Sequence, residues 1–105
     1  MHDNDIVHRD IKCANLFVMN SPDGEWDQIK LGDLNVSKVA KGAMLQTQTG
    51  TPYYASPEVW RDMPYNAKSD IWSAGCVIYE MAALKPPFTA ADMAQLYQKV
   101  IKGTF

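Results

Sequence analysis

Short apolar runs separated by turn-forming residues make up the first third of the chain. Residues 6–7 are Ile-Val, and a second apolar run occupies residues 16–19. A short apolar run bounded by turn signals is typical of a buried strand. Residues 20–24 read Asn-Ser-Pro-Asp-Gly and precede a further strand-like stretch at 28–31. The pattern therefore predicts a β-hairpin with a rather long turn over residues 16–31.

Residues 36–51 have neither a helical nor a strand period and are rich in Thr, Gln, Lys and Gly. Long irregular segments in small domains usually carry a function. We therefore expect a long surface loop over this part of the chain.

A short helix and a longer amphipathic helix are predicted in the second half. Ser56 offers an N-cap hydroxyl and Pro57 a first-turn proline, which together start the short helix. Asp92 follows Thr89 in a capping arrangement for the last helix, which Gly103 closes. The apolar stripe of this last helix consists of Met93, Leu96, Tyr97, Val100 and Ile101.

A third helix is predicted between these two. It opens at Ser69 and Asp70 and stops near Leu84, because the two prolines at 86–87 forbid its continuation. Its apolar residues cover nearly the whole circumference, which is typical of a helix buried on all sides. They are Ile71, Trp72, Ala74, Val77, Ile78, Met81 and Ala82.

Composition limits the size of the fold and the kinds of partner. With 105 residues, of which 47% are hydrophobic, the chain forms at most one compact domain. The formal net charge is -2 and the Lys and Arg residues are scattered, so we expect no nucleic-acid partner. The N-terminus has no apolar signal segment and no long apolar run occurs, so we expect no membrane partner. Cys13 and Cys76 lack paired spacing and indicate free thiols in a reducing compartment, the cytoplasm.

The candidate chemistry begins with a group of polar residues ahead of the predicted hairpin. His8, Arg9 and Asp10 are followed by Asn15, five residues after the aspartate. This spacing suits a loop that aims a general base at a substrate hydroxyl and an amide oxygen at a magnesium ion. It fits the catalytic-loop pattern of protein kinases, with Ile11 in place of Leu.

Two further motifs follow in the order that this pattern requires. Residues 33–35, Asp-Leu-Asn, stand in the place of Asp-Phe-Gly, and residues 56–58, Ser-Pro-Glu, in the place of Ala-Pro-Glu. The chain thus resembles the protein kinase family from His8 to its end. Gly32, Phe17 and the Gly-Thr-Pro-Tyr-Tyr stretch at 50–54 make it most similar to the NIMA-related serine/threonine kinases.

The resemblance implies a role for each matched position. Asp10 would be the catalytic base, and Lys12 would neutralise charge on the transferring phosphoryl group. Asn15 and Asp33 would hold the magnesium ions that bridge the phosphates of ATP. Phe17 would form the floor under the adenine ring. The implied cofactors are therefore ATP and Mg2+.

The resemblance also implies regulation through the segment that follows. Thr47 occupies the position at which the related kinases are phosphorylated, and Arg9 and Lys38 would supply cations for the added charge. Thr51 would belong to the substrate loop and, with Lys12, supports the serine/threonine class.

Departures and alternative interpretations remain open beside these roles. Asn35 stands where the family has glycine, which predicts a stiffer hinge, and Leu34 replaces Phe as an apolar plug. Asp70 is either an early-turn acid favoured by the helix dipole or, by resemblance, a buried carboxylate that accepts N–H bonds from the catalytic loop. His8 is expected to be structural with a backbone partner, whereas His2 is expected only to face solvent.

No glycine-rich loop, lysine strand or helix with a paired glutamate precedes His8. We therefore expect residues 1–105 to be a partial protein kinase domain: an α+β, mainly α fragment of the C-terminal lobe with a small β-hairpin. The parent would be an ATP-dependent kinase that phosphorylates Ser or Thr of protein substrates, and the chain alone would be inactive. The alternative is a non-catalytic, pseudokinase-like binding module. Family resemblance alone points to cytoskeletal or ciliary partners in the cytoplasm.

Ala14 sits where an acid would help to capture a basic substrate, and Glu80 is an acid that could take this part. Substrate specificity therefore stays open at this stage.

Overall fold

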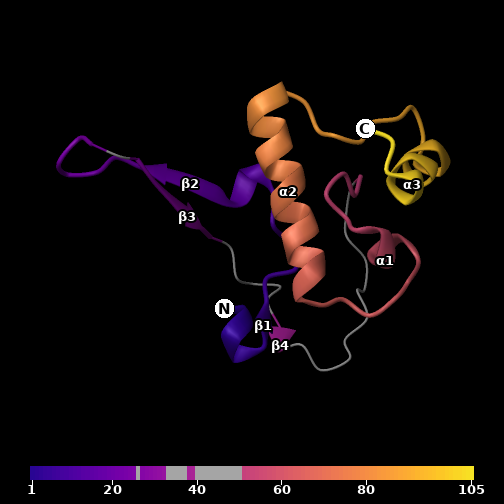
Figure 1. Ribbon diagram of the computed structural model, residues 1–105, viewed down its shortest axis with the longest axis horizontal. Coiled ribbons are helices and arrows are strands. Elements are labelled where there is room, and N and C mark those ends of the chain that lie inside the picture. Colours follow the sequence, from indigo (N-terminus) through magenta and orange to yellow (C-terminus); the bar gives the residue numbers. More distant parts are fainter. Residues whose placement is uncertain (26, 33–37, 40–50) are drawn as a thin grey trace.

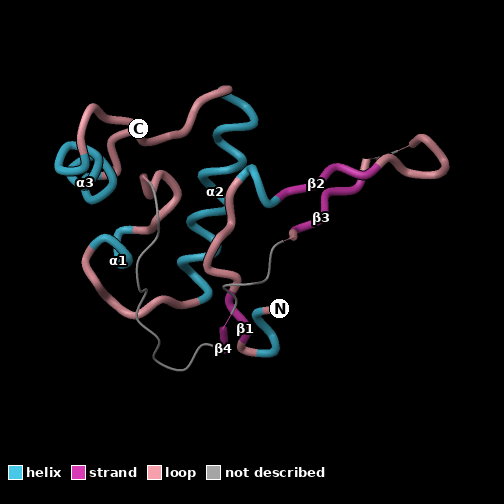
Figure 2. Tube along the Cα trace, turned by 180° about the vertical axis from the view of Figure 1, so that it is seen from behind, coloured by secondary structure: helices cyan, strands magenta, loops and turns pink. Residues whose placement is uncertain are grey.

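One long helix forms the centre of the molecule. The computed structural model describes residues 1–25, 27–32, 38–39 and 51–105. The β2–β3 hairpin projects from one side of α2, and α1 and α3 lie on the other side (Figure 1). The same arrangement is seen from behind in Figure 2. In chain order, the elements are the 3-10 turn η1 (His2–Asn4), β1 (Ile6–Val7), the 3-10 turn η2 (Cys13–Asn15), β2 (Leu16–Met19), β3 (Gln28–Leu31), β4 (Lys38–Val39), α1 (Pro57–Trp60), α2 (Ala67–Ala83) and α3 (Met93–Lys102).

Two small antiparallel sheets are formed. In the predicted hairpin, β2 pairs with β3 so that Leu16 faces Leu31. In the other sheet, β1 pairs with β4, and Ile6 faces Val39. The hairpin prediction is confirmed. The segment predicted as a loop over 36–51 includes β4, and most of its other residues lie outside the described part of the chain.

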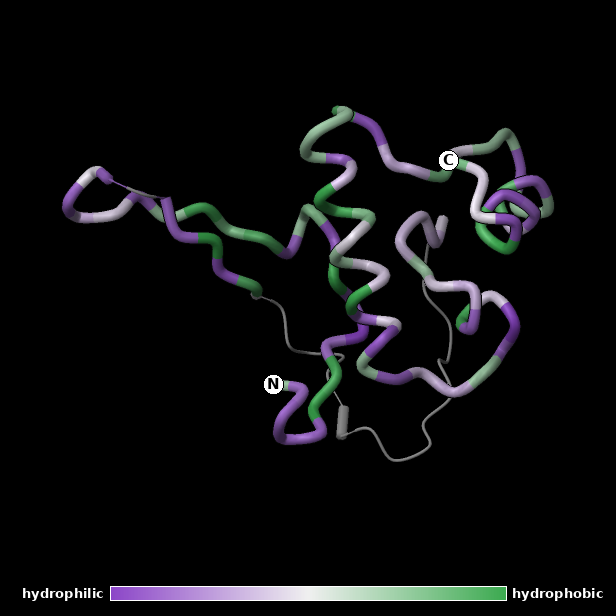
Figure 3. Tube along the Cα trace, viewed as in Figure 1, coloured by the Kyte–Doolittle hydropathy of each residue, from purple (hydrophilic) through white to green (hydrophobic). Residues whose placement is uncertain are grey.

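The hairpin strands are exposed, although the apolar run predicted a buried strand. The exposed fraction is 54% for Phe17 and 63% for Val18. In Figure 3, β2 is largely green, whereas green and purple alternate along β3. The prediction was wrong because burial needs a packing partner, and the described elements leave most of this hairpin uncovered.

Helix α2 begins earlier than predicted because Asn66 caps it. The side-chain oxygen of Asn66 accepts the N–H of Lys68 at 2.8 Å, and the Ser69 hydroxyl accepts the N–H of Asn66 at 3.4 Å. This reciprocal pair is a capping box. Ser69 is therefore the third residue of the helix rather than its first. The helix ends at Ala83, ahead of the two prolines at 86–87 and close to the predicted end near Leu84. Leu84 itself takes up a left-handed conformation with φ 58°.

Burial of α2 is one-sided, contrary to the prediction of a helix buried all round. Cys76 and Val77 are buried, but Ile71, Ile78 and Met81 are 58%, 68% and 55% exposed. The prediction placed Met81 in the core, and this was wrong. An apolar pattern reports which faces could be buried, and the described elements cover only one of them.

The hydrophobic core lies between α2 and the C-terminal segment. Phe88, Leu96 and Val100 are each at most 4% exposed and cluster with Cys76. The Trp72 ring stacks on Phe88 with centroids 5.7 Å apart and planes at 9°. Trp72, which was predicted to be buried, thus packs against this core. Leu96 and Val100 of the apolar stripe of α3 belong to the core, although Met93 at the start of that stripe is 49% exposed.

The two remaining helices follow the predicted end signals with two differences. Helix α1 starts with Pro57, but Ser56 at the N-cap position makes no side-chain capping bond. Helix α3 is capped by Asp92 itself, whose carboxylate accepts the N–H of Gln95 at 2.8 Å. Gly103 ends α3 with φ 67°, as predicted. No helix within the described ranges is both long enough and apolar enough to span a membrane.

Candidate active site

The catalytic-loop residues that the sequence singled out lie together between β1 and β2. The amide nitrogen of Asn15 donates to the backbone oxygen of Asp10 at 2.7 Å and to its Oδ2 at 3.1 Å. Lys12 Nζ lies 3.3 Å from Asp10 Oδ2. One carboxylate, one ammonium group and one amide therefore meet within hydrogen-bonding range.

The amide of Asn15 has a defined orientation in this group. Asn15 is 6% exposed, and its nitrogen uses its two hydrogens on Asp10. The amide oxygen therefore points away from Asp10. Amide oxygens are hard ligands of the kind that Mg2+ prefers.

His8 is a structural residue, as predicted. Its side chain is fully buried, and its Nδ1 accepts the backbone N–H of Asp10 at 3.2 Å. Since Nδ1 accepts, Nε2 carries the proton and donates to the backbone oxygen of Gly32 at 2.9 Å. The imidazole thus joins the backbone of Asp10 to that of Gly32, directly after β3.

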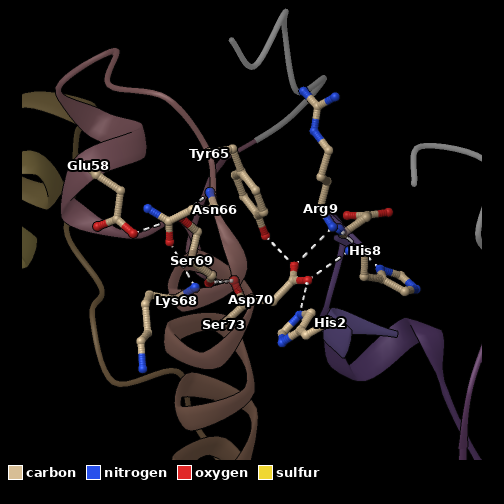
Figure 4. Close-up of polar contacts among 11 residues, drawn as sticks. His2, His8, Arg9, Glu58, Tyr65, Asn66, Lys68, Ser69, Asp70 and Ser73 are labelled. Carbon is tan, nitrogen blue, oxygen red and sulfur yellow. Dashed lines mark hydrogen bonds and ion pairs between the residues drawn. The ribbon is translucent and has the colours of Figure 1, made fainter. Parts of the chain in front are cut away.

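Asp70 anchors the catalytic loop to α2. One carboxylate oxygen accepts the N–H of His8 at 2.7 Å and the other accepts the N–H of Arg9 at 3.0 Å. The same carboxylate accepts the Tyr65 hydroxyl and, at 2.9 Å, Nε2 of His2 (Figure 4). The second of the two interpretations of Asp70 is therefore confirmed: it is a fully buried carboxylate that accepts four hydrogen bonds.

Ionisation in this cluster follows from the bonding. Burial opposes the charge on Asp70, but the hydrogen bonds from Tyr65, His2, His8 and Arg9 outweigh it, so the pKa of this carboxyl is below its usual range. The pKa of the Tyr65 hydroxyl is raised strongly by burial and by the adjacent Asp70 charge. Asp70 therefore stays a carboxylate and Tyr65 stays a donor at neutral pH.

The backbone of Arg9 has an unusual conformation, which its hydrogen bond to Asp70 helps to hold. Its φ is 71°, a left-handed conformation that is uncommon for residues other than glycine. Its N–H is bound by Asp70, and its guanidinium lies over the Tyr65 ring, 5.9 Å from the centroid. This geometry places a cation near the catalytic loop with a side chain that is 8% exposed.

His2 and Tyr65 are site residues that the sequence analysis missed. His2 was expected to face solvent, and this was wrong, because it is hydrogen-bonded to a carboxylate 68 positions away. No local pattern signals such a distant partner. Tyr65 lies five residues before Asp70 and directly precedes the Asn66 cap. This position was the signal from which a hydroxyl donor to Asp70 could have been expected.

The segment that begins at Thr51 is attached to α2 by Tyr54. The Tyr54 hydroxyl donates to Glu80, and the Ser73 hydroxyl donates to the backbone oxygen of Tyr54 at 2.9 Å. Burial and the Glu80 carboxylate raise the pKa of Tyr54 well above its usual range. Glu80, which the sequence offered as an acid for basic substrates, is therefore already engaged by a donor. Thr51 is exposed, and its backbone oxygen accepts the N–H of Tyr53 at 3.0 Å.

A further contact joins the site to its surroundings. The Ser69 hydroxyl donates to Glu58 at 2.7 Å, which connects α1 to α2.

Cys13 and Cys76 are free thiols, as predicted. Burial raises the pKa of the Cys13 thiol, which also contacts Tyr54 and Glu80. It raises the pKa of Cys76 to about 11, so both thiols are protonated at neutral pH.

Some predicted site residues lie outside the described part of the chain. They are Asp33, Leu34, Asn35 and Thr47, and for Lys38 only the backbone is described. Among the described residues no group of three or more His, Cys, Asp or Glu side chains could hold a metal ion. The roles of Asp33, Thr47 and Lys38 therefore stay predictions.

Comparison with known proteins gives one consistent result. Residues 1–105 match the family described as "Protein kinase domain". Serine/threonine-protein kinase Nek4 of Mus musculus is 45% identical over an alignment of 105 positions, which covers 98% of this chain and 13% of that protein. Serine/threonine-protein kinase Nek3 of Oryza sativa subsp. japonica is 47% identical over 104 residues, 98% of this chain and 17% of that protein. The "Probable serine/threonine-protein kinase nek2" of Dictyostelium discoideum is 47% identical over 104 residues, 98% of this chain and 24% of that protein. The chain thus spans less than a quarter of the length of these three relatives.

Proposed function

Because the chain belongs to the protein kinase family and is most similar to Nek serine/threonine kinases, we propose that it carries the catalytic loop of such a kinase. The reaction is transfer of the γ-phosphoryl group of ATP to Ser or Thr side chains of protein substrates. The observation that supports this most directly is the convergence of Asp10, Lys12 and Asn15. These residues provide a base, a cation and an amide oxygen in one loop, which is the set that phosphoryl transfer needs.

The described residues fit the proposed cofactors. The Asn15 oxygen points away from Asp10 and is a suitable magnesium ligand, with Asp33 as the second ligand by resemblance. The Phe17 ring is 54% exposed, so a flat apolar surface is available to a purine base. When bound, ATP with Mg2+ supplies the transferable phosphoryl group and neutralises charge on it.

The residues of the loop have distinct tasks in this proposal. Asp10 orients the substrate hydroxyl and accepts its proton. Lys12 places an ammonium group 3.3 Å from Asp10 Oδ2, where it opposes negative charge that gathers on the transferring group. His8, through its bond to the Asp10 backbone, fixes the direction of the base.

Replacement of the base tests the proposal. In the longest form of the protein, Asp10→Ala should lower the turnover of a Ser/Thr peptide substrate by about 100- to 10,000-fold, because a positioned base contributes this much. The Kd for ATP, measured by calorimetry with Mg2+, should change little. Asp23→Ala, an exposed acid in the hairpin turn, is the matched control and should leave both values unchanged.

The results distinguish the proposal from its alternative. Equal turnover in Asp10→Ala would remove the base from the mechanism. A wild-type protein that binds ATP or a protein partner but transfers no phosphoryl group would instead be the non-catalytic binding module.

Regulation through Thr47 is a separate part of the proposal, based on family resemblance. A phosphate there adds a charge of about -1.5 to -2, for which Arg9 and Lys38 would, by resemblance, supply the cations. Thr47→Ala should therefore leave the intact kinase poorly active, whereas Thr49→Ala should not. Peptide phosphorylation by the two variants compares them directly, and equal activities would refute the role of Thr47.

Cytoplasmic location, with cytoskeletal or ciliary partners, is also proposed from the family resemblance alone. Fluorescence microscopy of the tagged protein would show it, and a tagged protein confined to another compartment would refute it.

A further inference from the structure

Gly32, the residue directly after β3, lies beside the Phe17 ring. A Cβ atom at position 32 would lie 2.6 Å from Cε2 and 3.1 Å from Cδ2 of Phe17. Carbon atoms make favourable contacts at about 3.5 to 4.0 Å. A side chain at position 32 and the Phe17 ring in its present place therefore exclude each other.

The backbone of Gly32 is held on both sides and cannot easily move away. Its N–H donates to the backbone oxygen of Asn15 at 2.8 Å. Its carbonyl oxygen accepts the proton of His8 Nε2 at 2.9 Å. His8 is fully buried and Asn15 is 6% exposed, so both partners are themselves fixed by the surrounding structure.

The Phe17 ring is the mobile partner in this contact. It is 54% exposed and extends from β2, where its residue pairs with Lys30. Rotation about χ1 would move the ring into solvent without breaking a strand hydrogen bond. A Cβ at position 32 would therefore displace the ring and leave the backbone in place.

We propose that Gly32 is a positioning residue for the nucleotide base, because its missing side chain leaves the space in which the Phe17 ring lies. This inference rests on the proposed function, in which the ring supports the adenine of ATP. Gly32 need not touch the nucleotide, since it acts through the ring. The chemical class concerned is a purine nucleotide, and the effect is on binding of the base rather than on the transfer step.

The test compares Gly32→Ala, Phe17→Leu and the double variant in the longest form of the protein. Gly32→Ala should raise the KM for ATP by about 5- to 20-fold, as expected for contacting residues, and change kcat less than about twofold. In the Phe17→Leu background the same substitution should have little effect on KM, because the ring that it displaces is gone. Gly75→Ala is the control: a Cβ there meets nothing within 4 Å, so KM should not change.

A second readout does not depend on activity. Nuclear Overhauser effects between the Phe17 ring protons and the Gly32 Hα protons should be present in the wild-type protein. In Gly32→Ala the ring should show no such contact with residue 32, while the melting temperature should shift little, because the ring is exposed. If Gly32→Ala does not fold, the double variant is compared with Phe17→Leu, and equal KM values are expected.

The outcomes separate this inference from the proposed function. An unchanged KM in Gly32→Ala, or an equal rise in the Phe17→Leu background, overturns the role of Gly32 while the kinase assignment stands. A wild-type protein that binds no ATP overturns the proposed function and, with it, this role.

Discussion

Asp70→Asn is the substitution for which the structure makes the sharpest stability prediction. The change keeps the shape of the side chain but replaces one acceptor oxygen with an NH2 donor. The N–H groups of His8 and Arg9 are bound to different oxygens of the carboxylate. Whichever way the new amide turns, one of these two buried N–H groups loses its acceptor.

The size of the effect follows from this count. A buried donor without an acceptor costs about 1 to 3 kcal/mol. Tyr65 can rotate its hydroxyl proton and His2 can change its tautomer, so both can adapt to the new donor. The bonds that remain lose the charge of their acceptor, which adds roughly 1 to 2 kcal/mol. We therefore expect Asp70→Asn to lower the free energy of unfolding by about 2 to 5 kcal/mol.

Urea denaturation of wild-type and variant protein measures this difference, and hydrogen exchange localises it. The His8 and Arg9 amides should lose protection in Asp70→Asn. Asp92→Asn is the matched control, because Asn and Asp are about equally good N-caps. If Asp70 acted only on the dipole of α2, the loss would be about 0.3 to 1 kcal/mol, so a value in that range would refute the anchoring role.

Acid titration gives an independent check of the same anchor. The folded-state pKa of Asp70 is below the ordinary value of 3.8, so its charge stabilises the fold above that pH. This contribution is lost as the pH falls through the lowered folded-state pKa. The stability difference between wild type and Asp70→Asn should thus shrink as the pH falls below about pH 4. A constant difference down to pH 2 would contradict the lowered pKa. Glu58, whose pKa is also lowered, is present in both proteins and cancels.

Three further experiments test the core, the bond between Tyr54 and Glu80, and a helix end by denaturation. Leu96→Ala, at a side chain 1% exposed, should destabilise by about 2 to 5 kcal/mol, whereas Met93→Ala on the same helix should change stability by less than about 1 kcal/mol; similar losses would contradict the core assignment. In a double-mutant cycle, Tyr54→Phe and Glu80→Gln should couple by about 1 to 3 kcal/mol, and additive effects would show that their bond contributes nothing. Gly103→Ala should lose about 1 to 2 kcal/mol, because alanine disfavours the φ of 67°, and no loss would contradict the left-handed cap.

Local signals in the sequence predicted the existence of each main element. The turn residues at 20–24 predicted the hairpin, and Pro57 predicted the start of α1. Asp92 and Gly103 gave the limits of α3. These signals act within a few residues of the position that they determine, so they can be recognised without the fold.

Burial was less predictable, because it depends on which elements come to lie beside one another. Cys76 and Ile78 are both apolar residues of α2, two positions apart, yet one is 5% and the other 68% exposed. The sequence pattern placed Ile78 among the buried residues and did not include Cys76. Only the positions of Phe88 and Leu96, which come from further along the chain, decide which face of α2 is covered.

The candidate site shows the same division between local and distant causes. The mutual contacts of Asp10, Lys12 and Asn15 arise within a loop of six residues that the sequence motif singled out. The loop keeps that shape through bonds to Asp70 and Gly32, which lie 62 and 24 positions from His8. These partners are brought in by α2 and by the end of β3.

His8 therefore has a particular place in the site. Its backbone N–H binds Asp70, its Nε2 binds Gly32, and its Nδ1 accepts the N–H of Asp10. A displacement of α2 or of the β3 end would act on the position of Asp10 through this one buried residue. The geometry around Asp10 is consequently a property of the whole described fold, although Asp10 itself lies in a short motif.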